Sequence, residues 1–157
     1  MKRFRILLHG VMIAFFSAAT AAWAAPDPPP EDKDKKLEQA RAAIERQDWA
    51  AAQAVLREAL REDAGRAEYH NLYAYSIRKG ERPQMDLVFR HYHEALRLKP
   101  DHRGAHEYLG EAYLMVGNVA KAREHLAVLG QLCAKGCDEQ AKLAQAIADY
   151  GRGLARK

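Results

Sequence analysis

The stretch that decides the fold lies in the second half of the chain. It reads His106-Glu107-Tyr108-Leu109-Gly110-Glu111-Ala112-Tyr113, then Gly117-Asn118, then Ala122, Leu126 and Leu129. Apolar and small side chains recur at helical spacing on both sides of Gly117-Asn118. Asn118 can cap a helix that begins at the next residue, and Gly110 and Ala122 are small enough to let two helices approach closely. The stretch therefore predicts two packed helices joined by a short turn.

The same pattern occurs twice earlier in the chain. One copy runs from His70 through Ile77 and continues with Val88, Tyr92, Ala95 and Pro100, and another has Ala40, Ala43, Asp48-Trp49, Ala52, Leu56 and Ala59. Ala59 and Ala95 are 36 residues apart, and Ala95 and Leu129 are 34 apart. The two extra residues fall around Gly80 to Pro83, in a turn, where an insertion is tolerated best. The chain is thus predicted to repeat one helix-turn-helix unit three times.

This pattern resembles the tetratricopeptide repeat, a 34-residue helical hairpin with the signature W-x2-L-G-x2-Y…A-x3-F…P. The third unit matches best, through Leu109, Gly110, Tyr113 and Ala122, although His106, Leu126 and Ala134 replace the usual Trp, Phe and Pro. The second unit keeps Pro100 and has Tyr92 at the aromatic position, and the first is degenerate, with Gln39-Ala40 at the Leu-Gly pair. The resemblance implies an all-α, right-handed α-solenoid with repeats at about residues 33–66, 67–102 and 103–136.

A solenoid needs covered ends. Asp138 can cap a final helix over residues 138–152, in which Leu143, Ile147 and Tyr150 form an apolar stripe. The stripe can lie on the last repeat while the opposite side of the helix faces water. The repeat domain is therefore expected to span residues 35–152, with this helix as its C-terminal cap.

The N-terminus predicts export. A basic segment from Met1 to Arg5 precedes a mostly apolar segment, and Ala22-Trp23-Ala24 is an A-x-A-type cleavage site. These are the three parts of a secretory signal peptide, here residues 1–24, with cleavage between Ala24 and Ala25 and delivery to the periplasm. Residues 25–34 are rich in proline and charge and are expected to form a linker. The alternatives are an uncleaved membrane anchor and a proline-rich ligand.

Composition limits the function. The 157 residues are 48% hydrophobic and 29% charged, as in a globular protein, and the net charge is +4. Lys2, Arg3 and Arg5 lie in the predicted signal peptide, so the remainder has 22 basic and 21 acidic residues. A nearly neutral chain has no broad electrostatic footprint for nucleic acid, and no nucleic-acid partner is expected. After signal cleavage no membrane association is expected either.

Two cysteines, Cys133 and Cys137, flank the break before the predicted capping helix. In an oxidising compartment, a pair this close with Gly136 between them is expected to form a structural disulfide. A redox-active pair and a metal thiolate site are the alternatives, although the spacing is not C-x-x-C.

Other residues give only weak evidence for metal binding or catalysis. His102 and His106 are four residues apart, a spacing that can bind a metal, but no carboxylate or cysteine completes a zinc motif. His106 is expected to pack at the Trp position of its repeat, and His91 and His125 are expected on outward helical faces. The sequence has no nucleophile motif and no phosphate-binding glycine loop. We therefore expect no metal, no cofactor and no enzymatic activity.

The remaining candidate for a functional site is a protein-binding surface. In tetratricopeptide repeat proteins the first helix of each unit lines a concave groove that binds an extended peptide or a helix. The resemblance places eight residues there: Leu37, Arg41, Asn71, Tyr75, Arg78, Glu107, Glu111 and Leu114. Asn and Arg side chains can hold a peptide backbone or carboxylate, and Tyr75 can stack. Capture of a C-terminal carboxylate is not expected, because Glu107 and Glu111 are acidic.

The resulting prediction is an exported scaffold or adaptor that binds another envelope protein or a peptide segment. The alternative function is metal handling or thiol redox chemistry through Cys133, Cys137 and nearby histidines. The alternative for the groove is a merely solvated inner face. A homodimer formed by end-to-end stacking is left open.

Overall fold

In a computed structural model of the chain, residues 34–155 are described, with side chains described for residues 34–153. The predicted signal peptide (1–24) and nearly all of the predicted linker (25–34) lie outside this range. Seven helices follow one another, and the described residues contain no strand: α1 (Lys35–Glu45), α2 (Trp49–Glu62), α3 (Ala67–Lys79), α4 (Met85–Leu98), α5 (Arg103–Met115), α6 (Val119–Leu132) and α7 (Asp138–Ala155). The all-α fold is confirmed.

Local chemistry sets several helix ends. The side chains of Asp34, Asp48 and Asn118 accept hydrogen bonds from the backbone N–H three residues on, at 3.0–3.1 Å, and so begin α1, α2 and α6. Gly117, just before Asn118, has a φ of 78°, which glycine adopts without strain. The predicted caps at Asp48 and Asn118 are confirmed.

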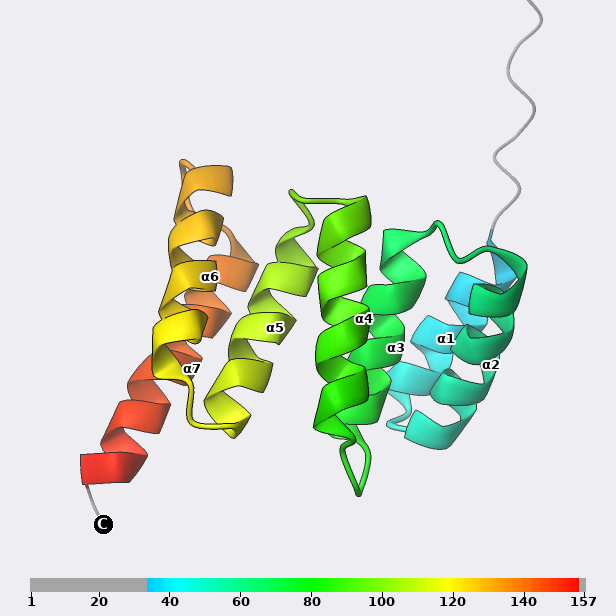
Figure 1. Cartoon of the computed structure of the whole chain (residues 1–157), viewed down its shortest axis with the longest axis horizontal. Coiled ribbons are helices and arrows are strands. Elements are labelled where there is room, and N and C mark those ends of the chain that lie inside the picture. The colour runs from blue at the N-terminus through cyan, green and yellow to red at the C-terminus, as the bar shows by residue number, and fades with distance from the viewer. Residues whose placement is uncertain (1–33, 156–157) are drawn as a thin grey trace, which may run out of the picture. The chain divides into compact units, whose positions relative to one another are not determined.

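The helices pack as three antiparallel hairpins and a final single helix, arranged in a row (Figure 1). α1 contacts α3, α3 contacts α5 and α5 contacts α7. Within the described residues, α2 does not contact α4 and α4 does not contact α6. The odd-numbered helices therefore lie closer together than the even-numbered ones. We call the surface that they form the inner face.

The core runs along the row between the two layers of helices. Its largest fully buried side chains include Leu56 in the first unit, Tyr92 in the second, and Leu109 and Leu129 in the third. Small residues stand where helices meet, as expected. A Cβ atom added to Gly110 would lie 2.6 Å from Leu143 Cδ2, so only glycine lets α7 dock this closely on α5.

α7 covers the last repeat as predicted. Leu143 is fully buried and Ile147 and Tyr150 are half-buried. One detail differs: Asp138 is the first residue of α7, and the Cys137 carbonyl accepts a hydrogen bond from the Ala141 N–H at 3.1 Å. Cys137 therefore begins the hydrogen-bonding pattern of α7, and Asp138 places its carboxylate in the first turn.

The turn between α6 and α7 brings Cys133 and Cys137 to disulfide distance, with their Cα atoms 5.7 Å apart. Gly136 has a φ of 83° and donates its N–H to the Cys133 carbonyl at 2.7 Å. The pair thus closes the turn that leads into the capping helix. Among the described helices, none combines the length and the apolar character that crossing a membrane requires.

Candidate functional site

All eight residues predicted for the groove lie on α1, α3 and α5, the helices of the inner face. Their exposure differs from that of a solvated surface. Four are buried, with exposed fractions of 8% or less, and only Arg41 is exposed; the buried four are Asn71, Arg78, Glu107 and Leu114. The sequence placed these residues on the correct helices, but it did not show which of them contact one another.

Arg78 is the centre of the inner face. Its Nη2 donates to Glu111 Oε2 at 2.7 Å, and its Nε donates to the Tyr92 hydroxyl at 3.3 Å. The guanidinium also lies 5.4 Å from the Tyr75 ring centroid and 5.7 Å from that of Tyr108. The two rings are themselves 4.6 Å apart. An aromatic and cationic cluster therefore joins α3, α4 and α5.

The N-terminal half of the inner face, formed by α1, α3 and the start of α5, is internally paired. Arg41 donates to Glu68 at 2.9 Å, and His102 Nε2 donates to the other oxygen of Glu68 at 2.8 Å. His102 Nδ1 accepts from the Ala105 N–H at 3.3 Å, so the proton of the neutral ring is on Nε2. The hydrogen bond from His102 lowers the pKa of Glu68 to about 2, with Arg41 acting in the same direction.

The sequence did not single out Glu68. A signal was present, because Glu68 and Asn71 are three residues apart and therefore lie on the same side of α3. Nothing in the sequence alone showed that Glu68 would meet Arg41 and His102, which are 27 and 34 residues away.

The C-terminal half, formed by α5 and α7, is paired only in part: Arg103 Nε of α5 lies 3.7 Å from Glu139 Oε1 of α7, but Glu107 has no such partner. Burial raises the pKa of Glu107 to about 7; the charges of Glu111 and Glu139 act in the same direction, and Lys142 and Arg78 oppose them. A cavity of about 560 Å³ adjoins this region. Its lining comes from α5 and α7 and consists of Glu111, Ala141, Lys142, Gln145, Ala146 and Asp149. This half can accept hydrogen bonds or positive charge from a bound group.

The histidines form two equivalent pairs. His70 Nδ1 lies 2.8 Å from His91 Nδ1, and His106 Nδ1 lies 2.9 Å from His125 Nδ1. The other ring nitrogen of the inner histidine meets a backbone carbonyl, of Ala64 in one pair and of Pro100 in the other, so it carries the proton. The inner Nδ1 is then an acceptor, and the outer histidine donates to it.

The histidine pairs show that the expectation for His91 and His125 was wrong and that the expectation for His106 was right. His91 and His125 do not simply face outward, because each is half-buried against the inner helix of its own hairpin. Burial, together with the neighbouring histidine, lowers the pKa of both to about 4. His106 is buried at the Trp position and packs there as expected. Among residues 34–153, no group of three or more His, Cys, Asp or Glu is arranged to hold a metal ion.

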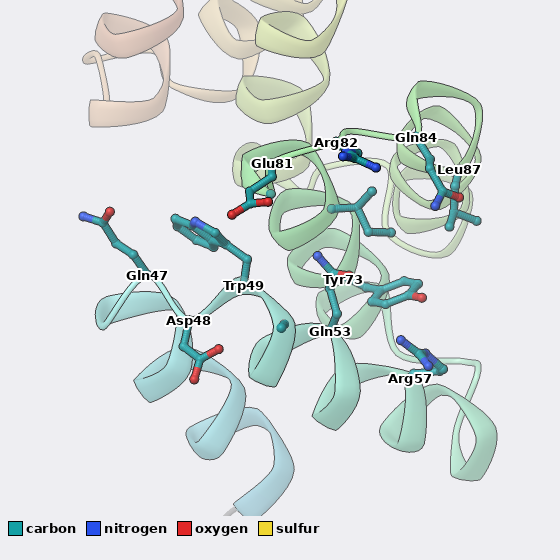
Figure 2. A pocket seen from close by; sticks show the side chains of 13 residues that line it. Gln47, Asp48, Trp49, Gln53, Arg57, Tyr73, Glu81, Arg82, Gln84 and Leu87 are labelled. Carbon is teal, nitrogen blue, oxygen red and sulfur yellow. The ribbon is translucent and has the colours of Figure 1, made fainter.

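A second cavity, of about 590 Å³, lies between the first two units, away from the predicted groove residues (Figure 2). Trp49, Gln53 and Arg57 of α2 face Glu81, Arg82 and Leu87 across it. The repeat insertion around Gly80 to Pro83 contributes to its wall. Its charged side chains are exposed and of mixed sign, so this cavity selects no charge.

No family model matches the sequence, and no curated protein matches it. Two solved structures of the type III secretion translocator chaperone SycD from Yersinia enterocolitica are similar in fold. One has a TM-score of 0.66 at 13% identity and covers 77% of this chain and 84% of its own. The other, described as an alternative dimer, has a TM-score of 0.62 at 18% identity and covers 80% of this chain and 96% of its own. The chain therefore has a tetratricopeptide-like helical repeat fold.

Proposed function

We propose that this chain is an exported, non-enzymatic adaptor that binds a segment of another envelope protein on its inner face. The observation that carries the proposal is the cluster around Arg78, in which the guanidinium and the Tyr75 and Tyr108 rings lie together on α3 and α5 and are fixed by Glu111 and by Tyr92 of α4. Arg and Tyr are the side chains that most often anchor protein interfaces. The cluster is pre-organised, which lowers the entropy lost on binding.

Two further observations support the proposal. The solved structures with a similar fold are of a chaperone, a protein whose role is to bind other proteins. The basic, apolar and small-residue segments at the N-terminus support export to the periplasm. The mass of the protein recovered from an expressing bacterium tests export, since cleavage leaves a chain that starts at Ala25.

Site-specific photo-crosslinking in living cells tests the binding face. A photoreactive residue at Gln145 or Arg41, on the inner face, should capture one discrete partner band. The same residue at Arg90 or Arg123, which are exposed on α4 and α6, is the matched control. Equal capture from both faces would show that the inner face is not the binding surface.

The alternative function, thiol redox chemistry, can be tested at Cys133 and Cys137, which lie at disulfide distance. If the pair performs redox chemistry, Cys133→Ser should abolish function without a loss of stability. If the pair is structural, the same change should lower stability and leave partner capture intact.

A further inference from the structure

Two residues on the inner face, Asn71 and Glu107, are largely buried and have a hydrogen-bond acceptor without a donor among the described residues. Asn71 is 2% exposed and its Oδ1 has no partner. The Glu107 residue is 4% exposed and has no hydrogen-bond or ion-pair partner among the described residues, although its carboxylate oxygens, unlike Asn71 Oδ1, are not completely buried. A buried acceptor without a donor costs free energy, most of all when it is a carboxylate.

The two acceptors are equivalent and neighbouring. They are 36 residues apart and occupy the same register of α3 and α5. The Asn71 side chain points at α5, because a Cβ atom added to Gly104 would lie 3.6 Å from Asn71 Nδ2. Gly104 is about one turn before Glu107, and Glu107 is about one turn before Glu111. The hydrogen-bond acceptors of Asn71, Glu107 and Glu111 therefore lie in one strip along one side of α5.

Positive charge near this strip is already committed or exposed. Arg78 is bound to Glu111, and only Oε2 of Glu111 is engaged. Lys142 is exposed on α7 and forms no ion pair within the described residues. The cavity beside Glu111 has room for another group, because Ala141 and Ala146 form part of its lining.

We propose that the strip between α5 and α7 receives a lysine or arginine side chain of the bound protein segment. The inference rests on the proposed function and specifies the chemistry of its partner. A guanidinium offers five donors and an ammonium offers three, and either would satisfy Glu107 and the second oxygen of Glu111. In the N-terminal half the Glu68 carboxylate already pairs with Arg41, and the unpaired Asn71 Oδ1 is a neutral acceptor that carries no charge for a cation to balance.

The test uses a positional library of N-acetylated, C-amidated nonapeptides in which one position at a time is Arg, Lys, citrulline or Glu. Citrulline keeps the shape of arginine without its charge. Binding to the intact protein is followed by fluorescence anisotropy. At one position the wild-type protein should bind the Arg or Lys peptide about tenfold more tightly than the citrulline peptide.

Glu107→Gln should remove this preference and leave the affinity for the citrulline peptide unchanged. Glu38→Gln, which removes an exposed carboxylate on α1, is the matched control and should keep the preference. Far-ultraviolet circular dichroism of each variant shows that it is folded.

Every other outcome overturns the inference in a distinguishable way. Binding without a preference for Arg or Lys overturns the inference and leaves the proposed function standing, as does a preference that survives Glu107→Gln. A preference that appears only in Lys142→Ala shows that Lys142 itself occupies the strip in the native protein. If no peptide binds, the proposed function fails, and the inference fails with it.

Calorimetry gives an independent readout. Since the pKa of Glu107 is about 7, this carboxyl is partly protonated at pH 7, and a bound cation should expel the proton. At pH 7 we expect a net release of protons when an Arg peptide binds, measured from binding enthalpies in buffers of different ionisation enthalpy. Glu107→Gln should release none. Proton release that persists in this variant would assign it to another group.

Discussion

In the N-terminal half of the inner face, Arg41, Glu68 and His102 join α1, α3 and α5 through hydrogen bonds, whereas in the C-terminal half Glu107 lies buried beside α7 without a donor. Glu68 on α3 and Glu107 on α5 lie on equivalent helices of successive repeats, but the C-terminal half is completed by the capping helix α7. The two glutamates nevertheless have pKa values of about 2 and about 7. The charge state of an inner-face residue therefore depends on its neighbours on adjacent helices.

The largest effect is expected at Arg78, where the two halves meet. Arg78→Ala should lower the free energy of unfolding by about 3 kcal/mol, because it leaves Glu111 without its cation and removes the packing between two tyrosines. Urea unfolding measures the change. The double variant Arg78→Ala with Glu111→Ala should lose less stability than the two single variants lose together, and a double-variant loss equal to their sum would show that the ion pair contributes nothing.

The next effect tests how α7 completes the C-terminal half. Gly110→Val should cost about 2–3 kcal/mol, because any Cβ at this position overlaps the fully buried Leu143. Hydrogen exchange should increase along α7 and remain unchanged in α1 and α2. Gly151→Ala is the control, since nothing lies near that position and alanine favours a helix. A neutral Gly110→Val would mean that α7 can dock differently.

The disulfide should act on the C-terminal half alone. Replacing both Cys133 and Cys137 by Ser should lower the free energy of unfolding by about 2 kcal/mol, the value for a short closed loop. The melting temperature reports the loss, and peptide-resolved hydrogen exchange should locate it in α6 and α7. An unchanged melting temperature together with lost partner capture would favour the thiol alternative.

The smallest expected effects on stability are those at Glu68 and Glu107, and they should have opposite signs. At pH 8, Glu68→Gln should destabilise the protein and Glu107→Gln should stabilise it, each by about 1 kcal/mol. The reason is that Glu68 is paired with Arg41 and His102, whereas Glu107 is a largely buried residue without a donor.

Their dependence on pH should also differ. The pKa of Glu68 is depressed in the folded state, so its contribution is present above pH 4.5 and lost as the pH falls towards 2. The pKa of Glu107 is raised, so the folded state favours its protonated form below the unfolded value of 4.5, and this advantage is lost as the pH rises through 7. The gain from Glu107→Gln should therefore vanish below pH 4.5. Urea midpoints of the wild type and both variants across pH 2–8 check both trends, and changes of the same sign at Glu68 and Glu107 would contradict this difference between the halves.

Much of the fold was predictable because the helical hairpin repeats along the chain. The caps and turns that begin and end its helices are also set by residues close in sequence. Asp48 and Asn118 capped the helices that they were expected to cap, and Gly110 stands at the close approach that its size implied. The turn chemistry of a helix is determined within a few residues, so a single sequence reveals it. The first residue of α7 was less accurate, because Cys137 and Asp138 are adjacent and both can begin a helix.

The site was only partly predictable. The repeat register placed Arg41, Arg78 and Glu107 on the correct face, but it did not show that Arg78 would be buried or that Glu107 would lack a donor. His91 and His125 were expected to face outward, and each pairs with the inner histidine of its own hairpin. Each of these outcomes depends on residues about 20–35 positions away, which local patterns do not report.

By itself the sequence determined the helices, their order, the period of the repeat and which residues lie on the first helix of each unit, because spacing and capping act within one turn or one hairpin. Only the tertiary structure decided which inner-face charges are paired. The pairing of Glu68 and the isolation of Glu107 follow from how closely α3, α5 and α7 approach one another. That approach depends on packing between helices distant in sequence, at positions such as Gly110 and Leu143.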